Sequence, residues 1–458
     1  MKGRYKAYPE YKDSGIEWLG DVPQHWGVIQ IKHLSPVKRG ASPRPIDDAK
    51  YFDEDGEYAW TRIADVTASD VYLTKAPQRL SDLGSSLSVK LEQGSLFLSI
   101  AGTVGKPCIT GMKACIHDGF VYFPGLGIPN KFLFYVFAGE QAYKGLGKFG
   151  TQLNLNTDTV GGIKIGFAKD SELERIANFL DHETSKIDTL IEKQQQLIKL
   201  LKEKRQAVIS HAVTKGLNPD ALMKDSGVEW LGEVPEHWAV KRLKNVLMES
   251  MKNGLFKKKD QFGTGSLLVN VSDLYVDDYF IKLNSLDRVV TTAEEQKIYK
   301  VEIGDIFFVR SSLKLEGIGR SACLLEEHED VVFECHVVKA RPSKISTTSK
   351  YLVRYLNSPL ASQEFIRRSK TTTMTTIDQD NLTTINVVVP PRNEQVLIDS
   401  YLDRQLMKID QADSLAKESM KLYIERRKAL ISATVTGKID VRNWKLPEQN
   451  KTNKEGTV

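Results

Sequence analysis

Cysteine is scarce in this chain, with four residues among 458. A disulfide framework needs a much denser set of cysteines, so the sequence favours a protein that folds in a reducing compartment. Long apolar runs are lacking too, since no stretch approaches the roughly 18 consecutive apolar residues that cross a bilayer. The opening residues, MKGRYKAYPEYKDSG, contain no apolar segment of a secretory signal. We therefore expect a cytoplasmic protein with no membrane partner.

Motifs of catalysis and nucleotide binding are also missing from the sequence. AGTVGKP at 101–107 resembles a phosphate-binding loop only in part, because Ile100 replaces the first glycine and Pro107 the final Ser or Thr. No glycine-rich dinucleotide fingerprint is present. His25 and His237 recur in equivalent places, but no pattern of Ser, Cys or carboxylate partners accompanies them, so a structural role is the better interpretation. We predict that the chain has no catalytic residue.

Two groups of side chains could bind a metal ion: Cys108, Cys115 and His117, and Cys323, Cys335 and His336. Structural metal sites have regular ligand spacings, whereas these spacings are irregular and differ between the two groups. Buried thiols are the simpler explanation, since a free cysteine behaves as a small apolar side chain. We predict neither a metal ion nor a cofactor in this chain.

A long internal repeat is the main feature that the sequence does contain. KDSGIEWLGDVPQHW at 12–26 returns as KDSGVEWLGEVPEHW at 224–238, and 14 of the 24 positions of 11–34 match 223–246 without a gap. A spacing of 212 residues is far longer than a solenoid unit, which has roughly 20–50 residues. The repeat therefore indicates a duplicated domain.

Three further matches, offset by 222 residues, lie towards the end of each copy. FLDHETSKIDTL, EKRQAVIS and AVT in the first copy correspond to YLDRQLMKIDQA, ERRKALIS and TVT in the second. The chain is thus a direct tandem of globular part, long helix, globular part and long helix. The expected boundaries are 1–172 and 218–392 for the globular parts, 173–217 and 393–440 for the helices, and 441–458 for a tail that looks disordered from Arg442 onward.

The two helices are predicted from unbroken stretches with a heptad pattern. No proline or glycine interrupts 174–211, and apolar residues recur every seven positions, as in a coiled coil. The predicted seam consists of Leu180, Ile187, Leu190, Leu197 and Leu201 in the first helix and Leu402, Ile409, Tyr423 and Leu430 in the second. An antiparallel coiled coil would give this direct repeat a pseudo-two-fold axis. The alternative is two separate amphipathic helices, each packed on its own globular part.

The globular parts have the pattern of a mixed α/β (α+β) fold. Short runs rich in β-formers, such as LFLSI, FVYF, IFFVR, VVFECHVVKA and INVVVP, alternate with turn residues. Helices are expected at 130–146 and 349–369, each followed by a polar segment, GKFGTQLNLNTDT or SKTTTMTTIDQDN. Such side chains could contact base edges or phosphates, or the segments could be solvated loops.

The formal net charge of +5 is a mild basic bias, which is compatible with nucleic acid but does not require it. Two kinds of function fit a chain with two similar heads and no catalytic motif. One is binding of double-stranded DNA. The other is a structural adaptor that joins two protein partners through its heads and has no DNA target.

The repeated SGxEWLGxVPxHW motif, the two divergent heads, and the repeated helix with KID, LIEKQQQLI and EKRQAVIS resemble the specificity (S) subunit of type I restriction–modification systems. The resemblance extends over nearly the whole chain, to about Val441, and its repeated motif is highly specific to this family. It implies that each head is a target recognition domain for one half of a bipartite DNA site. The paired helices would set the spacing of the halves and dock two modification subunits.

The same resemblance implies where the chemistry takes place. The modification subunits would bind S-adenosylmethionine and methylate adenine, and restriction subunits would add a nuclease and translocase that use ATP and Mg²⁺. This chain would hold no cofactor and catalyse nothing, in the cytoplasm of a bacterium or archaeon.

By the same resemblance, we place DNA contacts at the polar segment of each head and at a Gly-plus-cation loop, AGTVGKP at 101–107 in the first head and EGIGRS at 316–321 in the second. The predicted residues are Arg62, Lys106, Lys148, Gln152 and Asn154 in the first head and Asn270, Arg310, Lys314, Arg320, Lys370 and Thr373 in the second.

Overall fold

The computed structural model describes residues 5–144, 146, 148–149, 152–153, 155–327, 330–371 and 374–446, with only the backbone for 148–149 and 152–153. Within this part of the chain, no helix has both the length and the apolar character needed to cross a membrane. The chain divides into two compact units, residues 1–195 with 418–458 and residues 196–417. Each unit therefore combines one globular head with parts of both long helices, whereas the boundaries expected from the sequence separate head from helix.

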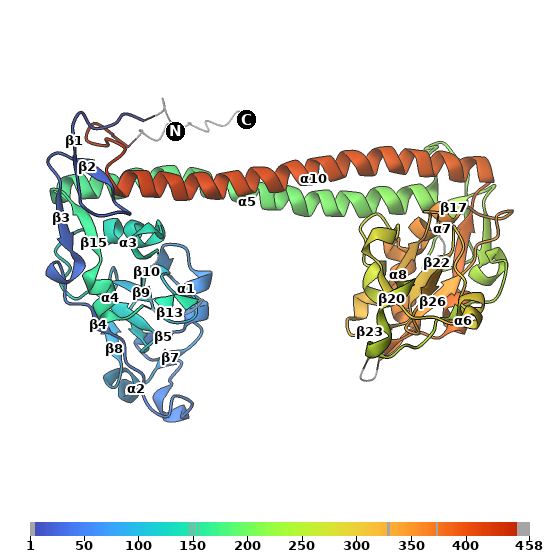
Figure 1. The fold of residues 1–458 in the computed structure, drawn as a ribbon, viewed down its shortest axis with the longest axis horizontal. Helices are drawn as coiled ribbons and strands as arrows, with labels where there is room; N and C mark the ends of the chain where they lie inside the picture. The colour runs from blue at the N-terminus through green and yellow to red at the C-terminus, as the bar shows by residue number, and fades with distance from the viewer. Residues whose placement is uncertain are drawn as a thin grey trace, which may run out of the picture. The chain divides into compact units, whose positions relative to one another are not determined.

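The two largest sheets in the described part of the first head have five and four strands. One has the strand order β4 (Lys38–Arg39), β12 (Phe120–Tyr122), β9 (Leu96–Ser99), β10 (Pro107–Thr110) and β6 (Tyr72–Leu73). The other has the order β7 (Arg79–Leu80), β5 (Tyr58–Thr61), β11 (Ala114–Ile116) and β8 (Val89–Leu91). Helix α3 (Asn130–Ala138) lies between the sheets and the long helices (Figure 1), and its Phe132 and Phe137 are buried in the core that it shares with them. The mixed α/β class is confirmed.

The second head repeats this plan. Its larger sheet has the order β19 (Lys252–Asn253), β26 (Val337–Ala340), β22 (Ile306–Val309) and β24 (Ser321–Cys323). A second sheet has the order β21 (Asp287–Val289), β20 (Phe262–Val269) and β25 (Val331–Phe333). The helix expected at 349–369 is divided into α7 (Ser349–Leu356) and α8 (Pro359–Arg368). The division occurs at Ser358, which caps α8, because Pro359 is tolerated in the first turn of a helix but not in its interior.

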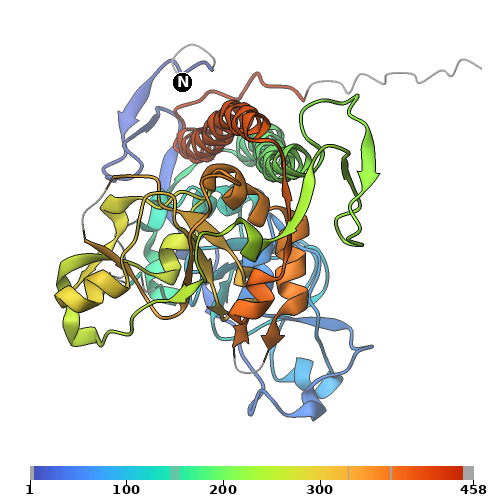
Figure 2. The ribbon, with the colours of Figure 1, turned by 90° about the vertical axis from the view of Figure 1, so that its right-hand side faces the viewer.

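The long helices are α5 (Asp170–Lys215) and α10 (Arg392–Val435), and within each unit the parts of the two helices lie side by side (Figures 1 and 2). In the first unit, Arg427 Nε donates to Asp188 Oδ1 at 2.8 Å. In the second unit, Arg205 forms the corresponding ion pair with Asp410. In the first unit the start of α5 and the end of α10 also meet at Trp26, which donates to Glu172 and lies beside Gly437, so the helices pair antiparallel. Asp410 and Arg427 are also the counterparts of Asp188 and Arg205 at the 222-residue offset, so the internal repeat relates the two ion pairs.

Most of the predicted seam residues are withdrawn from solvent. Five of them are buried, and Leu201 and Tyr423 are half-buried; the five are Leu180, Ile187, Leu402, Ile409 and Leu430. The prediction was wrong for Leu190 and Leu197, which are 37% and 41% exposed and therefore do not lie in the seam. The next residues along the helix, Ile191 and Ile198, are half-buried instead. Steps of three and of four residues both stay on one side of a helix, so only the position of the partner helix decides between neighbouring apolar residues.

The segment after α10 corrects a second expectation. Val441 is buried, and the Trp444 ring packs edge-on against Phe179 with centroids 5.6 Å apart. The backbone N–H of Asp440 donates to the Lys6 carbonyl at 2.8 Å. The tail expected to be disordered is therefore ordered through residue 446, since its aromatic and aliphatic side chains complete the core of the first unit. Residues 447–458 lie outside the described residues.

Candidate nucleic-acid interface

The repeated motif anchors the start of each long helix. The Trp26 indole donates to Glu172 Oε1 at 2.9 Å, the Tyr8 hydroxyl donates to the same oxygen at 2.6 Å, and His25 Nε2 lies 2.9 Å from Glu172 Oε2. Burial alone would raise the pKa of Glu172, but these three partners hold it below its ordinary value. Glu172 is in the first turn of α5, where a carboxylate also interacts favourably with the helix dipole.

The second copy repeats this arrangement. Trp238 Nε1 donates to Glu394 Oε2 at 2.9 Å, and His237 Nε2 lies 2.7 Å from Glu394 Oε1, in the first turn of α10. The recurring histidines thus have structural partners in both units. The motif recurs because two helix N-termini need the same anchor.

The end of each long helix docks on the same motif. Gly437, with φ +71°, follows α10, and a Cβ there would lie 2.3 Å from Pro23. Gly216, with φ +81°, follows α5, and its Cβ would lie 3.0 Å from the Trp238 ring. Each motif therefore contacts the start of one long helix and the end of the other, which fixes the helix pair to the head in each unit.

The glycines of the two Gly-plus-cation loops pack closely against aromatic rings of their own heads. Gly105 and Gly319 have positive φ values of 85° and 70°, and a Cβ would lie 2.5 Å from the nearest ring atom of Tyr143 or Phe365. The glycines are thus required for close packing on an aromatic ring. The loops face the long helices, where they line cavities of about 240 Å³ in the first unit and 320 Å³ in the second.

The cations of these loops lie beside the long helices. The Arg320 guanidinium donates to the carbonyls of Leu274 and Val276 at 3.2 and 2.8 Å and stacks on two tyrosine rings. Lys106 lines the first cavity together with Arg427 of α10. The DNA contacts predicted at Arg320 and Lys106 stay predictions, although both cations lie on the side of their head that borders the long helices and Arg320 already has protein partners.

In the second head, the structure joins two predicted segments. Strand β23 (Ser311–Ser312), which precedes Lys314, pairs with β28 (Thr375–Thr376), which in turn pairs with β27 (Lys370–Thr371). The side chains of Lys314 and Lys370 are both exposed. The loop and the polar segment thus form one small antiparallel sheet with cations and hydroxyls at its surface.

Arg310 lies beside this sheet. Its backbone N–H donates to the His336 carbonyl at 3.1 Å, and its own carbonyl accepts from the N–H of Ile377 at 3.0 Å. Arg310 is half-buried. Asn270 is held more tightly, because its side-chain Nδ2 donates to Asp287 at 3.2 Å. Thr373 lies outside the described residues.

The predicted residues of the first head are less closely associated. Arg62 precedes α1 (Ile63–Ala68) and is exposed, although Nε lies 3.3 Å from a carboxylate oxygen of Asp65. The polar segment forms the hairpin of β13 (Lys148–Phe149) and β14 (Gln152–Leu153). The side chains of Lys148 and Gln152, and the whole of Asn154, lie outside the described residues.

One basic segment of the second head was missed by sequence reasoning. FKKKDQF, at 256–262, presents Phe256 with 73% of its surface exposed and Phe262 with 41% exposed. Lys258 and Lys259 between them are exposed as well. The signal was available in the sequence as three adjacent lysines between two aromatic residues, a composition typical of nucleic-acid surfaces.

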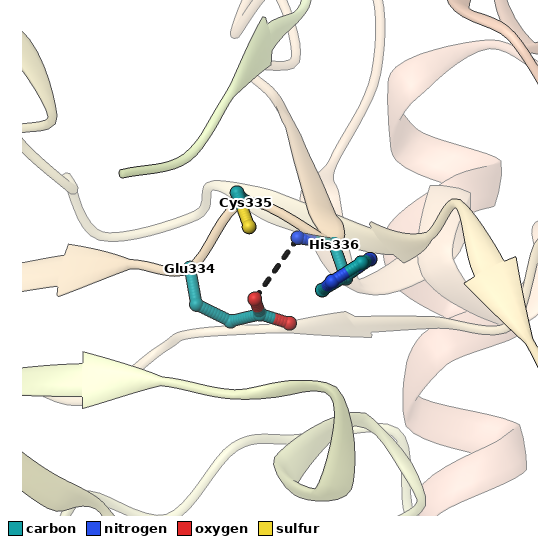
Figure 3. A group of neighbouring side chains, drawn as sticks. All are labelled: Glu334, Cys335 and His336. Carbon is teal, nitrogen blue, oxygen red and sulfur yellow. Dashed lines mark hydrogen bonds between the residues drawn. The ribbon is translucent and has the colours of Figure 1, made fainter. Parts of the chain in front are cut away.

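The turn between β25 and β26 holds a group that could reach one metal ion. One ligand atom from each of Glu334, Cys335 and His336 lies within 4.8 Å of the others. Figure 3 shows that a carboxylate oxygen of Glu334 accepts instead from the backbone N–H of His336, at 3.0 Å. Burial, and secondarily the charge of Glu334, raise the pKa of the Cys335 thiol, which favours the protonated form over a metal-binding thiolate.

The other candidate thiols are enclosed in the cores of the heads. Burial raises the pKa of Cys108 to about 12 and that of Cys115 to about 11. Burial also raises the pKa of Cys323. These thiols stay protonated at neutral pH, as expected for small apolar core residues rather than nucleophiles.

Comparison with known proteins agrees with this architecture. The chain matches the family described as type I restriction modification DNA specificity domain twice, over residues 23–200 and 235–413. It is 22% identical over 402 residues to the type I restriction enzyme EcoKI specificity subunit of Escherichia coli K12, covering 83% of this chain and 82% of that one. It is 22% identical over 452 residues to the type I restriction enzyme MjaVIII specificity subunit of Methanocaldococcus jannaschii, covering 92% and 95% of the two chains.

Solved structures share the fold. A chain from a study of complex assembly and conformational transition in the type I R-M system aligns with a TM-score of 0.67 and 14% identity, covering 91% of this chain and 99% of that one. The HsdS subunit from Thermoanaerobacter tengcongensis aligns with a TM-score of 0.50 and 14% identity, covering 91% and 98%.

Two matches to one domain, together spanning most of the chain, define its class: the protein belongs to the type I restriction modification DNA specificity family. It is a specificity subunit, and such subunits are not catalytic. This agrees with the failure to find catalytic motifs in the sequence.

Proposed function

We propose that this chain recognises a bipartite DNA site, one half with each head, and directs adenine methylation and restriction by partner subunits to that site. The observation that carries the proposal is a contrast between scaffold and surface. Both heads have the same sheet plan and the same Trp–His–Glu anchor to the long helices, whereas their exposed segments have different sequences. A duplicated scaffold with divergent surfaces is suited to one task performed on two different half-sites.

In the second head, Arg310, Lys314 and Lys370 are the proposed DNA contacts. They surround the small sheet of β23, β27 and β28, where hydroxyl groups of Ser and Thr accompany the cations. Cations neutralise phosphates and fix register, while hydroxyls and bidentate arginines can reach base edges. In the first head we propose Arg62 and the hairpin of β13 and β14. Thr373 and Asn154 are also proposed as DNA contacts, on the basis of their positions in the two polar segments of the sequence.

The long helices are the proposed docking sites for two modification subunits, which would bind S-adenosylmethionine. Large apolar side chains remain exposed on both helices, which is unusual for a solvated coiled coil and typical of a protein interface. They are Leu190, Leu422 and Ile424 in the first unit and Leu197, Leu200, Met407 and Leu415 in the second. Leu190 and Leu197, which are not inner seam residues, therefore have a proposed role in partner docking. Restriction subunits that use ATP and Mg²⁺ complete the proposed assembly.

Exchange of one head tests the proposal directly. Residues 35–150 are replaced by the matching part of a relative, the chain is expressed with its modification partner, and methylated adenines are mapped in the host genome. One half of the recognised site should change and the other should remain. A simultaneous change of both halves would contradict the assignment of one half-site to each head.

Direct binding distinguishes DNA recognition from the adaptor alternative. The complex with the modification partner should bind its site in a gel-shift assay, with an affinity that falls steeply with salt as counterions are released from phosphates. Lys370→Gln should reduce the slope of log Kd against log salt by about 0.9. An adaptor without a DNA target would retain no duplex in a sequence-dependent way.

A further inference from the structure

The exposed FKKKDQF segment of the second head differs from ordinary surface loops in how firmly Phe256 is presented. Leu255, before it, is buried, and its backbone N–H donates to the Phe333 carbonyl at 2.9 Å. Lys257, after it, is also fixed, because its ammonium lies 2.8 Å from Glu295 and its side chain is only 6% exposed. Phe256 therefore points outward between two immobilised neighbours. A side chain on a backbone that is already fixed loses less conformational entropy when it binds than one on a mobile loop.

The segment also carries charge that suits a polyanion. Lys258 and Lys259 follow Lys257, Lys252 precedes Phe256 on β19, and all three of these outer lysines are exposed. Lys252 is partly compensated by Glu249, at 2.8 Å. The combination of exposed aromatic rings and adjacent cations is the composition used to bind nucleic acid.

The first head lacks this feature at the equivalent place. Gly40 follows β4, and Gly254 follows β19 in the second head. The two glycines are equivalent, because a Cβ at Gly40 would lie 2.2 Å from the His117 carbonyl oxygen and one at Gly254 would lie 2.2 Å from the Phe333 carbonyl oxygen. After Gly40, however, the chain reads ASPRPIDDAKYFDEDGE, with many carboxylates. Its Tyr51 is buried, and the hydroxyl donates to the Arg44 carbonyl at 3.0 Å. The basic aromatic segment is thus a property of one head and not of the shared scaffold.

The segment adjoins the proposed DNA-binding sheet of the same head. Leu255 forms a bridge with Glu334, and Arg310 donates to the carbonyl of His336, so both sides are attached to the single turn drawn in Figure 3. Gln379, just beyond β28, donates through Nε2 to Asn253 Oδ1 at 2.9 Å. The small sheet and the FKKKDQF segment are therefore attached to the same turn of the second head.

We propose that residues 256–262 form an additional DNA contact of the second head, in which Lys258 and Lys259 neutralise phosphates and the Phe256 ring makes an apolar contact with bases of the half-site. This inference rests on the proposed function, since it assigns a further part of the same duplex to this head. A phenyl ring can contact a thymine methyl group in the major groove or the face of a base step, and either contact discriminates between sequences. The lysines contribute affinity without sequence preference.

The test uses the full chain in complex with its modification partner. Binding is measured by fluorescence anisotropy with a duplex that carries the sequence identified by methylation mapping. Lys258→Gln with Lys259→Gln should reduce the slope of log Kd against log salt by about 1.8, with similar losses for specific and random duplexes. Phe256→Ala should leave the slope unchanged and weaken binding to the specific duplex about tenfold. Methylation mapping should then show relaxed sequence at positions of one half-site only.

Lys344→Gln and Ile345→Ala are the matched control, because this lysine and isoleucine are adjacent and exposed in the same head but outside the segment. They should bind as the unmodified chain does, and circular dichroism should show that all variants are folded. Unchanged binding by the Phe256 and lysine variants would overturn the inference while leaving the proposed function intact. Relaxed sequence in both half-sites would overturn it too. An unmodified complex with no preference for the site over random duplex would refute the proposed function and the inference together.

Discussion

Reversal of one ion pair between the long helices gives the sharpest test of how they are paired. The Asp188 and Arg427 side chains are 33% and 21% exposed, and their contact is 2.8 Å long. Burial raises the pKa of the Asp188 carboxyl even though Arg427 lowers it, so desolvation offsets much of the attraction. Partly exposed pairs of this kind stabilise proteins by about 0.5–1 kcal/mol.

Asp188→Arg should therefore cost about 1–2 kcal/mol, because it removes the attraction and adds a repulsion of similar size. Adding Arg427→Asp restores an ion pair with reversed polarity, and stability should return to within about 0.5 kcal/mol of the unmodified chain. Asp188→Arg with Arg205→Asp should show no such rescue, because Arg205 lies on the same helix and pairs with Asp410. The assay is urea unfolding followed by circular dichroism at low salt and at about 1 M salt, where screening should shrink the differences.

The outcome depends on which partner rescues Asp188→Arg. Rescue by Arg427→Asp alone supports intramolecular antiparallel pairing in the first unit. Rescue by Arg205→Asp, or by neither change, would refute that pairing. The sister pair provides an internal replicate, since Asp410→Arg should be rescued by Arg205→Asp and not by Arg427→Asp.

Three further results are expected. Ile191→Asp should destabilise the helix pair by about 2–4 kcal/mol in urea unfolding, because it buries a charge. Leu190→Asp should change stability by less than about 1 kcal/mol and should instead weaken co-purification of the modification subunit. Equal effects of the two variants on stability would contradict the assignment of Ile191 to the seam. Glu172 has a lowered pKa in the folded state, so its contribution is present above the unfolded pKa of about 4.3 and is lost as pH falls through the folded value. Glu172→Gln should therefore flatten the decline of stability between about pH 5 and pH 3, and an unchanged acid profile would refute the anchor. Gly319→Ala should destabilise the second unit by more than about 1 kcal/mol in thermal unfolding, because its Cβ would enter the Phe365 ring from a left-handed backbone, and a neutral result would contradict the packing role of that loop.

The sequence alone determined the architecture, because that information is repeated and periodic. Two copies of the HW motif indicated two equivalent heads, and a seven-residue apolar spacing indicated two long helices. Local rules also located several strands, since β-rich runs such as IFFV at 306–309 coincide with strands of the heads. The resemblance carried by the motif then indicated the family.

Tertiary structure decided the roles of individual side chains. Leu190 and Ile191 both satisfy a helical apolar pattern, and only the position of the partner helix makes one inner and the other outer. Arg320 beside glycine has the local appearance of a phosphate contact, yet the carbonyls that bind its guanidinium lie more than forty residues away in the sequence. Phe256 is exposed because its two neighbours find partners elsewhere in the fold. Periodicity and motifs depend on nearby residues, whereas burial and hydrogen bonding depend on segments that only folding brings together.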